Sequence, residues 1–284
     1  MNKSIRIPDS SFLLLIVFFC HWSIPGQNST DNVTSDSRKL EAERVWELAV
    51  DAKGGRKKMY KVENLLISSI SEFQLGSNKY INRDLKLYVF PNKTWSIEDY
   101  RPSVFGLTMR MYNWETGMKY IFDPRGKSSS TAVLKPIEQI DVDRSKNSDG
   151  KVLWTGLVIY LLESKWWKPI PEVLTTGKIN SQKVDIIQTS LNGKRVDFFL
   201  DQQNHLPIRV NFHNFNKILK TTEINAVSIT DYVDIEGIQM PTKEIIIGEG
   251  NVSLAYQFNV DFDESIFLIP PSFEEGSQSW KKKN

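Results

Sequence analysis

Residues 252–262 read VSLAYQFNVDF, and this stretch decides the fold. Apolar side chains alternate with polar or small ones along its whole length. Successive side chains of a β-strand point to opposite faces of the sheet, so strict alternation predicts a long strand with one apolar and one solvated face. A single sheet of such strands needs a cover for its apolar face. The apolar set is Val252, Leu254, Tyr256, Phe258, Val260 and Phe262.

The same period of two recurs along much of the chain from Val62 onward. It is clear at residues 85–89 and 208–213, and short turn sequences separate the runs. The strongest hairpin signal is Asn192-Gly193, because Asn-Gly favours the tight turn that joins two antiparallel strands. We expect about eleven strands in one antiparallel sheet, since all the runs lie at hairpin distances from one another.

Three segments depart from this period and predict helices. Residues 40–52 carry apolar side chains at helical spacing and precede Gly54-Gly55, a pair that favours a helix end. Residues 136–146 and 154–165 lack alternation, and the second of them is apolar on nearly every side, which predicts burial. The predicted fold class is α+β. It consists of a single curved, unclosed antiparallel sheet (a half-barrel) with an N-terminal helix and a helical plug or lid.

The N-terminus has the order of parts that an export signal has. A weakly basic start precedes the apolar run FLLLIVFFC at residues 12–20, which is too short to span a membrane as a helix. An uncleaved anchor is the alternative. Cys20, the sole cysteine, lies in this run, so we expect no disulfide in the mature chain. The expected division is a signal peptide at 1–26, a flexible leader at 27–38, one domain at 39–276 and a basic tail at 277–284.

Composition and motifs give no support for several functional classes. The net charge is +2, and no basic patch precedes the C-terminal lysines, so nucleic acid is not an expected partner. His205 and His213 lack further ligands at metal-binding spacing, which favours two surface histidines over a zinc site. Asp261 and Asp263 share a strand face, but it is the solvated one. No nucleophile elbow or phosphate-binding loop occurs, so we expect no catalytic residue, metal or cofactor.

Three short motifs occur in a characteristic order along the chain. They are YVFPNKTW at 88–95, TGMKYIFDP at 116–124 and FLIPP at 267–271, and the stretches 199–209 and 231–241 accompany them. Together they resemble the LolA/LolB-type family of periplasmic outer-membrane lipoprotein-sorting (lipoprotein carrier) proteins. The resemblance implies one half-barrel domain, export to the periplasm of a bacterial envelope, and binding of lipid or lipoprotein acyl chains.

The resemblance also implies an arginine just before the Pro-Asn turn, which in the carrier hydrogen-bonds to the helical lid. In this sequence that lid-latch position is Phe90. A phenyl ring offers no hydrogen-bond donor, so this residue does not form the arginine latch. Arg83 and Arg101 are the alternatives for that role. We therefore expect the apolar cavity of this family, whereas the transfer of lipoproteins depends on a latch that Phe90 does not form.

The expected function is a non-enzymatic periplasmic carrier that holds an acyl chain or a lipoprotein lipid moiety between sheet and helices. Four tryptophans, Trp114, Trp154, Trp166 and Trp167, are expected around the helical insertion. The alternative is an envelope interaction or scaffold module with a packed, ligand-free interior, which docks a partner protein; in both cases we expect a monomer. The predicted lining is Trp46, Leu157, Tyr160, Leu161, Val196, Phe198, Val210, Phe212, Leu254, Tyr256 and Phe258.

Overall fold

The computed structural model describes residues 35–75, 78–99, 107–122, 134–138, 155–216, 221–246 and 250–268. The chain divides into two units, Met1–Val33 and Thr34–Asn284, and every described residue belongs to the second. The expected signal peptide, the leader up to residue 34, the basic tail, Arg101 and Trp154 lie outside the described residues.

A single antiparallel sheet of 13 strands dominates the described part of the chain. The strands are β1 (Asn64–Leu75), β2 (Asn78–Val89), β3 (Lys93–Asp99), β4 (Leu107–Asn113), β5 (Met118–Phe122), β6 (Lys135–Pro136), β7 (Ile170–Ile179), β8 (Gln182–Leu191), β9 (Lys194–Asp201), β10 (Pro207–Asn216), β11 (Thr221–Ile235), β12 (Ile238–Ile246) and β13 (Gly250–Phe258). The predicted antiparallel, unclosed sheet is confirmed, with thirteen strands instead of about eleven.

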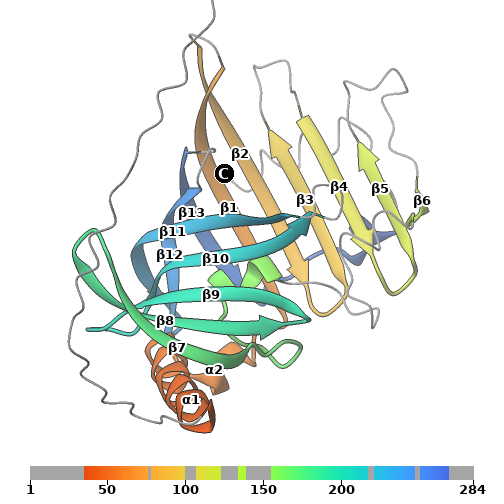
Figure 1. Ribbon diagram of the computed structural model, residues 1–284. Coiled ribbons are helices and arrows are strands. Elements are labelled where there is room, and N and C mark those ends of the chain that lie inside the picture. The colour runs from red at the N-terminus through yellow and green to blue at the C-terminus, as the bar shows by residue number, and fades with distance from the viewer. Residues whose placement is uncertain are drawn as a thin grey trace, which may run out of the picture. The chain divides into compact units, whose positions relative to one another are not determined.

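Two runs of hairpins make up this sheet. The strand order is β6-β5-β4-β3-β2-β1-β13-β12-β11-β10-β9-β8-β7, so each run follows the sequence and the pairing of β1 with β13 joins them. Figure 1 shows β7–β11 crossing the direction of β1–β4 at a steep angle. Leu65 lies opposite Phe258 at the junction. Reciprocal hydrogen bonds fix this register, because Asn64 Nδ2 donates to the Val260 carbonyl (3.1 Å) and Val260 N–H donates to Asn64 Oδ1 (2.8 Å).

The N-terminal helix α1 (Ser35–Ala52) packs on β7 and β8 and is followed by the short α2 (Arg56–Met59). Its buried face follows helical spacing: Ala42, Val45, Trp46 and Ala49. The predicted helix end at Gly54-Gly55 is confirmed, and both glycines have positive φ (123° and 84°), which favours glycine. The helix begins at Ser35, so residues 35–38, expected in the leader, are helical.

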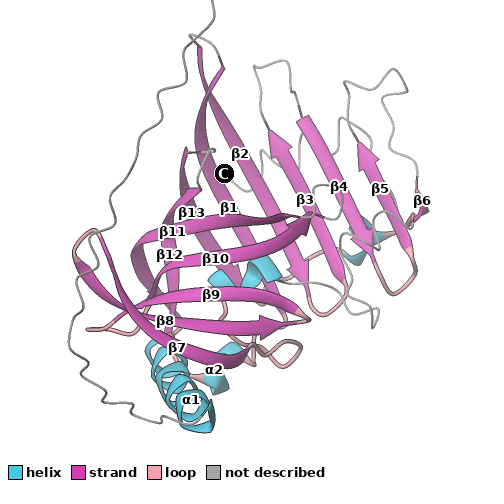
Figure 2. Ribbon diagram, in the orientation of Figure 1, coloured by secondary structure: helices cyan, strands magenta, loops and turns pink. Residues whose placement is uncertain are grey.

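Residues 154–165 differ from the expected buried helix. In the described residues 155–169, helical structure is limited to the 3₁₀ turn η1 (Thr155–Ile159) (Figure 2). The segment turns at Ser164, whose Oγ accepts hydrogen bonds from the backbone N–H of Trp166 (3.0 Å) and Trp167 (3.3 Å). The predicted burial is confirmed for Leu157 through Leu162, apart from the partly buried Tyr160. A buried loop thus takes the place of the helical plug here.

The other predicted mid-chain helix, residues 136–146, is not found where it can be checked. Pro136 belongs to the two-residue strand β6, and residues 137 and 138 are not helical. Residues 139–146 lie outside the described residues.

The apolar side of the sheet changes face between its two halves. We call the face covered by α1 and residues 155–167 the inner face. It is apolar on β8–β13 and the start of β1. On β2–β4 the same face carries Asp84, Lys86, Glu98 and Arg110, while the apolar row points to the opposite, outer face, under the 3₁₀ turn η2 (Glu264–Phe267). The expectation of one apolar face was therefore wrong for β2–β4. Register defines the outer row as Leu66, Leu87, Trp95, Met111 and Tyr120.

Candidate functional site

All eleven predicted lining residues lie in one hydrophobic cluster on the inner face. They come from α1, from η1 and the loop after it, and from β9, β10 and β13. Trp46 packs edge-on against Phe198 with 5.0 Å between ring centroids, and Tyr160 packs against Tyr256 at 5.5 Å. Most of the eleven are buried, while Tyr160, Phe212 and Leu254 are partly exposed at the border of the cluster.

A buried carboxylate anchors the loop of residues 160–169 to the helices, and the sequence did not reveal it. The side chain of Glu163 is 0% exposed. It accepts hydrogen bonds from Trp46 Nε1 (2.7 Å), Arg56 Nε (2.6 Å) and the Tyr60 hydroxyl (3.1 Å). Arg56 also binds the exposed Glu47 through two hydrogen bonds of 2.7 Å. The polar edge of Trp46 is therefore held by protein atoms, and its ring is fixed in the cluster.

A second carboxyl group, that of Glu244, lies on the inner face, and its Oε1 has no hydrogen-bond partner among the described residues. Glu244 of β12 is 3% exposed and sits between Ile229 of β11 and Val252 of β13 in the register. Burial raises its pKa to about 7, while a hydrogen bond with Tyr160 and the charges of Lys53 and Lys86 oppose that rise. The alternation of β12 places Ile238, Met240 and Glu244 on one face. The next residue, Ile245, is apolar but points to the opposite face. The sequence pattern therefore did not indicate that Glu244 is buried.

Lys53 continues the buried face of α1 one turn beyond Ala49. It is 0% exposed, and its Nζ lies 3.4 Å from the Ile159 carbonyl oxygen and 4.7 Å from the ring centroid of Tyr232. Burial lowers its pKa to about 7, and the charge of Glu244 acts in the opposite direction. The spacing from Trp46 and Ala49 was the sequence signal for this position.

At the lid-latch position, Phe90 makes aromatic contacts in place of a hydrogen bond. It is buried, and its ring centroid lies 5.2 Å from that of Trp166 and 5.1 Å from that of Trp167. Trp114, also expected near this segment, stacks on Tyr112 at 5.6 Å and packs against the inner cluster. Phe90 thus contacts the loop that takes the place of the expected plug.

Phe90→Leu is expected to reduce the free energy of unfolding by about 1 kcal/mol, because the two aromatic contacts are lost while most of the apolar volume is kept. The emission maximum of the native protein should shift as well, since Trp166 and Trp167 change environment. Urea unfolding followed by tryptophan fluorescence measures both quantities. Wild-type stability together with a wild-type spectrum would contradict this role of Phe90.

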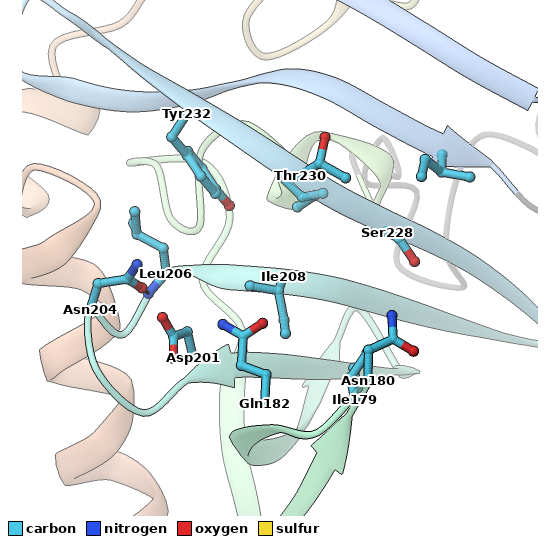
Figure 3. A pocket seen from close by; sticks show the side chains of 12 residues that line it. Ile179, Asn180, Gln182, Asp201, Asn204, Leu206, Ile208, Ser228, Thr230 and Tyr232 are labelled. Carbon is cyan, nitrogen blue, oxygen red and sulfur yellow. Dashed lines mark hydrogen bonds between the residues drawn. The ribbon is translucent and has the colours of Figure 1, made fainter.

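A pocket of about 430 Å³ lies elsewhere, between the β7–β8 turn and strands β9–β12. Figure 3 shows Ser228 and Thr230 on one side of it and Asn180 and Gln182 on the other. Tyr232 also lines it, and the hydroxyl of this residue donates a 2.7 Å hydrogen bond to the Pro207 carbonyl. None of the eleven predicted residues lines this pocket, so it is distinct from the predicted site.

His213 differs from the expectation of a surface residue, while His205 is partly exposed in a turn. His213 Nε2 lies 2.8 Å from Asp197 Oδ2, and both side chains are largely buried. The pairing of β9 with β10 brings them together, and Asp197 also accepts from Arg195. Among the described residues, no three His, Cys, Asp or Glu side chains gather to hold a metal ion.

No helix in the described part of the chain is long and apolar enough to cross a membrane.

Solved structures of similar arrangement were found by comparison. No protein-family model matches the chain, and no curated protein matches its sequence. A LolA superfamily protein from Nitrosomonas europaea is 15% identical with a TM-score of 0.46, and the match covers 80% of this chain and 96% of that one. An outer membrane lipoprotein-sorting protein domain from Vibrio parahaemolyticus is 14% identical with a TM-score of 0.42, covering 80% and 97%. The structural neighbours thus include LolA superfamily proteins.

A DUF1329 family protein from Desulfovibrio piger is 11% identical with a TM-score of 0.47, and the match covers 80% of this chain and 96% of that one. At these identities and TM-scores, function has to be inferred from the residues of this chain.

Proposed function

We propose that this chain is a non-enzymatic carrier or binding protein that holds an acyl chain on the inner face of its sheet. The observation that supports the proposal is the convergence of eleven apolar side chains from α1, residues 157–161 and three strands into one cluster. Export is part of the proposal and rests on the sequence pattern of residues 1–26, and a bacterial periplasm as the destination rests on the resemblance of the motifs to the LolA/LolB-type family.

Apolar burial alone supplies enough free energy for such a ligand. Each CH₂ group removed from water contributes about 0.8 kcal/mol, so a chain of about 16 carbons contributes on the order of 10 kcal/mol before the costs of association. A lipid therefore needs few specific polar contacts to bind.

The inner face also suits an amphiphile, because its apolar part adjoins a polar part. Ile67 of β1 lies between Tyr256 of β13 and Lys86 of β2 in the same register row. From Lys86 onward the row continues through Ser96 and Arg110. A ligand with an apolar chain and a polar end can match this change from one half of the sheet to the other.

Leu254→Asp is expected to reduce binding of a fluorescent fatty acid at least tenfold. Leu254 is a partly buried member of the cluster on β13, and a carboxylate there would lie beside the bound chain, where its desolvation opposes binding. Titration of the delipidated protein measures the change, and native mass spectrometry of gently purified wild-type protein should show bound lipid.

Ser253→Asp is the matched control, because Ser253 is the preceding residue, exposed on the opposite face of the same strand. This variant should bind like wild type. Equal loss in both variants, or a wild-type protein that binds no fatty acid, would refute the carrier. The second result would instead favour the docking module with a packed interior.

A further inference from the structure

Five buried side-chain atoms of the described residues have no hydrogen-bond partner, and two of them are oxygens at the inner cluster, Glu244 Oε1 and the Tyr256 hydroxyl. Both side chains are more than nine-tenths buried, at 3% and 8% exposure. Buried polar atoms are normally satisfied, because an unmade hydrogen bond leaves the full cost of desolvation. Two such atoms at one apolar cluster therefore point to a partner that the described residues do not supply.

Tyr160 contacts both of the residues that carry these oxygens. Its ring packs against the ring of Tyr256, and its hydroxyl hydrogen-bonds to the Glu244 carboxyl. Tyr160 is partly exposed at the border of the cluster. The register of β13 with β1 and of β1 with β2 then leads from Tyr256 to Lys86, where the polar part of the inner face begins. The unpartnered oxygens thus lie where the apolar and polar parts meet.

The surrounding charges select a neutral partner. At pH 8 Lys86 carries a charge beside Glu244, while Lys53, with a pKa of about 7, is mostly neutral, so an ammonium group would meet the like charge of Lys86. A phosphate or carboxylate would meet the Glu244 carboxylate itself. A neutral amide avoids both conflicts, because its N–H donates to a carboxylate oxygen and its carbonyl accepts from a tyrosine hydroxyl.

We propose that Glu244 and Tyr256 form a polar subsite that selects an amide-linked acyl chain, with the amide N–H on Glu244 Oε1 and the amide carbonyl on the Tyr256 hydroxyl. This inference rests on the proposed function, since the subsite belongs to the same interior. It adds the chemical class of the ligand, which apolar contacts alone leave open.

The test compares N-methylpalmitamide with methyl palmitate, which have the same chain and carbonyl and differ in one N–H. Both displace a fluorescent fatty acid from the full-length mature protein at pH 8, where the Glu244 carboxyl is mostly ionised. Wild type should prefer the amide about tenfold. Glu244→Leu should reduce that preference to about one, because the acceptor is gone. Tyr256→Phe should weaken both ligands to a similar extent, since both present a carbonyl.

Tyr232→Phe is the control, because that partly buried hydroxyl already has a protein partner in the Pro207 carbonyl. It should leave the amide preference unchanged. Equal affinity of wild type for amide and ester, or a preference that survives in Glu244→Leu, would overturn the subsite and leave the carrier standing. Binding of neither ligand would overturn both.

Discussion

Replacing Glu163 with glutamine is expected to lower the free energy of unfolding by about 1–3 kcal/mol, the cost of leaving a buried hydrogen-bonding group unpaired. Three side chains, those of Trp46, Arg56 and Tyr60, donate four hydrogen bonds to this carboxylate. The amide of glutamine keeps one acceptor oxygen and turns an NH₂ group toward donors, so at least one of them is left unpaired in a buried place. Urea unfolding, followed by far-ultraviolet circular dichroism, measures the loss.

Glu47→Gln is the matched comparison, because Glu47 binds the same Arg56 from the surface, with its side chain 53% exposed. An exposed ion pair contributes about 0–1 kcal/mol, so this variant should remain close to wild type. If Glu163→Gln lost no more stability than Glu47→Gln, the buried carboxylate would not be the anchor of residues 160–169.

The second large effect is a loss of stability between pH 5 and pH 7 that depends on Glu244. The pKa of this carboxyl rises from 4.5 to about 7 in the folded protein. The folded state therefore binds more protons than the unfolded state in this window, and stability falls as pH rises through it. Since a tenfold change in an equilibrium corresponds to about 1.4 kcal/mol, the full displacement corresponds to about 3 kcal/mol.

Lys53 acts in the adjoining window with the opposite slope. Its pKa falls from 10.5 to about 7 in the folded protein, so the unfolded state binds more protons above pH 7 and stability rises with pH there. The minimum of stability is expected near pH 7. The two groups interact, so their contributions are measured best by replacing one of them.

Glu244→Gln should remove the decrease between pH 5 and pH 7, because an amide does not titrate. Urea unfolding at pH 5, 6 and 7, at constant ionic strength, measures the slope. Glu172→Gln, a change at an exposed carboxyl on β7, should keep the wild-type slope. A wild-type slope in Glu244→Gln would show that the decrease has another origin.

Alternation along residues 252–262 predicted β13 and the inner placement of Tyr256 and Phe258. It predicted too long a strand, because Asn259 has a φ of +49° and ends it. Beyond this residue, Val260 and Phe262 pack against the hydrophobic cluster of the outer face, and not against the cluster of the inner face. Periodicity reports that one side of a strand is apolar, but it does not report which face of the sheet is covered at that point. The change of face at β2 escaped prediction for the same reason.

The polar members of the site escaped prediction for a different reason. Glu163 and Glu244 are charged residues in buried places, and their partners come from segments far away in the sequence. Neither the loop of residues 160–169 nor β12 carries a local pattern that distinguishes them from solvated glutamates. The apolar lining could be predicted because the spacing of apolar residues in each strand or helix indicates which of its faces is buried.

The junction of β1 with β13 has a consequence for how the sheet forms. Within each run of hairpins a strand pairs with its neighbour in sequence, whereas β1 and β13 come from opposite ends of the described chain. Pairings between distant segments form slowly, because the loop entropy has to be overcome first. Until this pairing forms, β1 and β13 are unpaired edges, and aggregation of the newly made chain is expected to begin at these two strands.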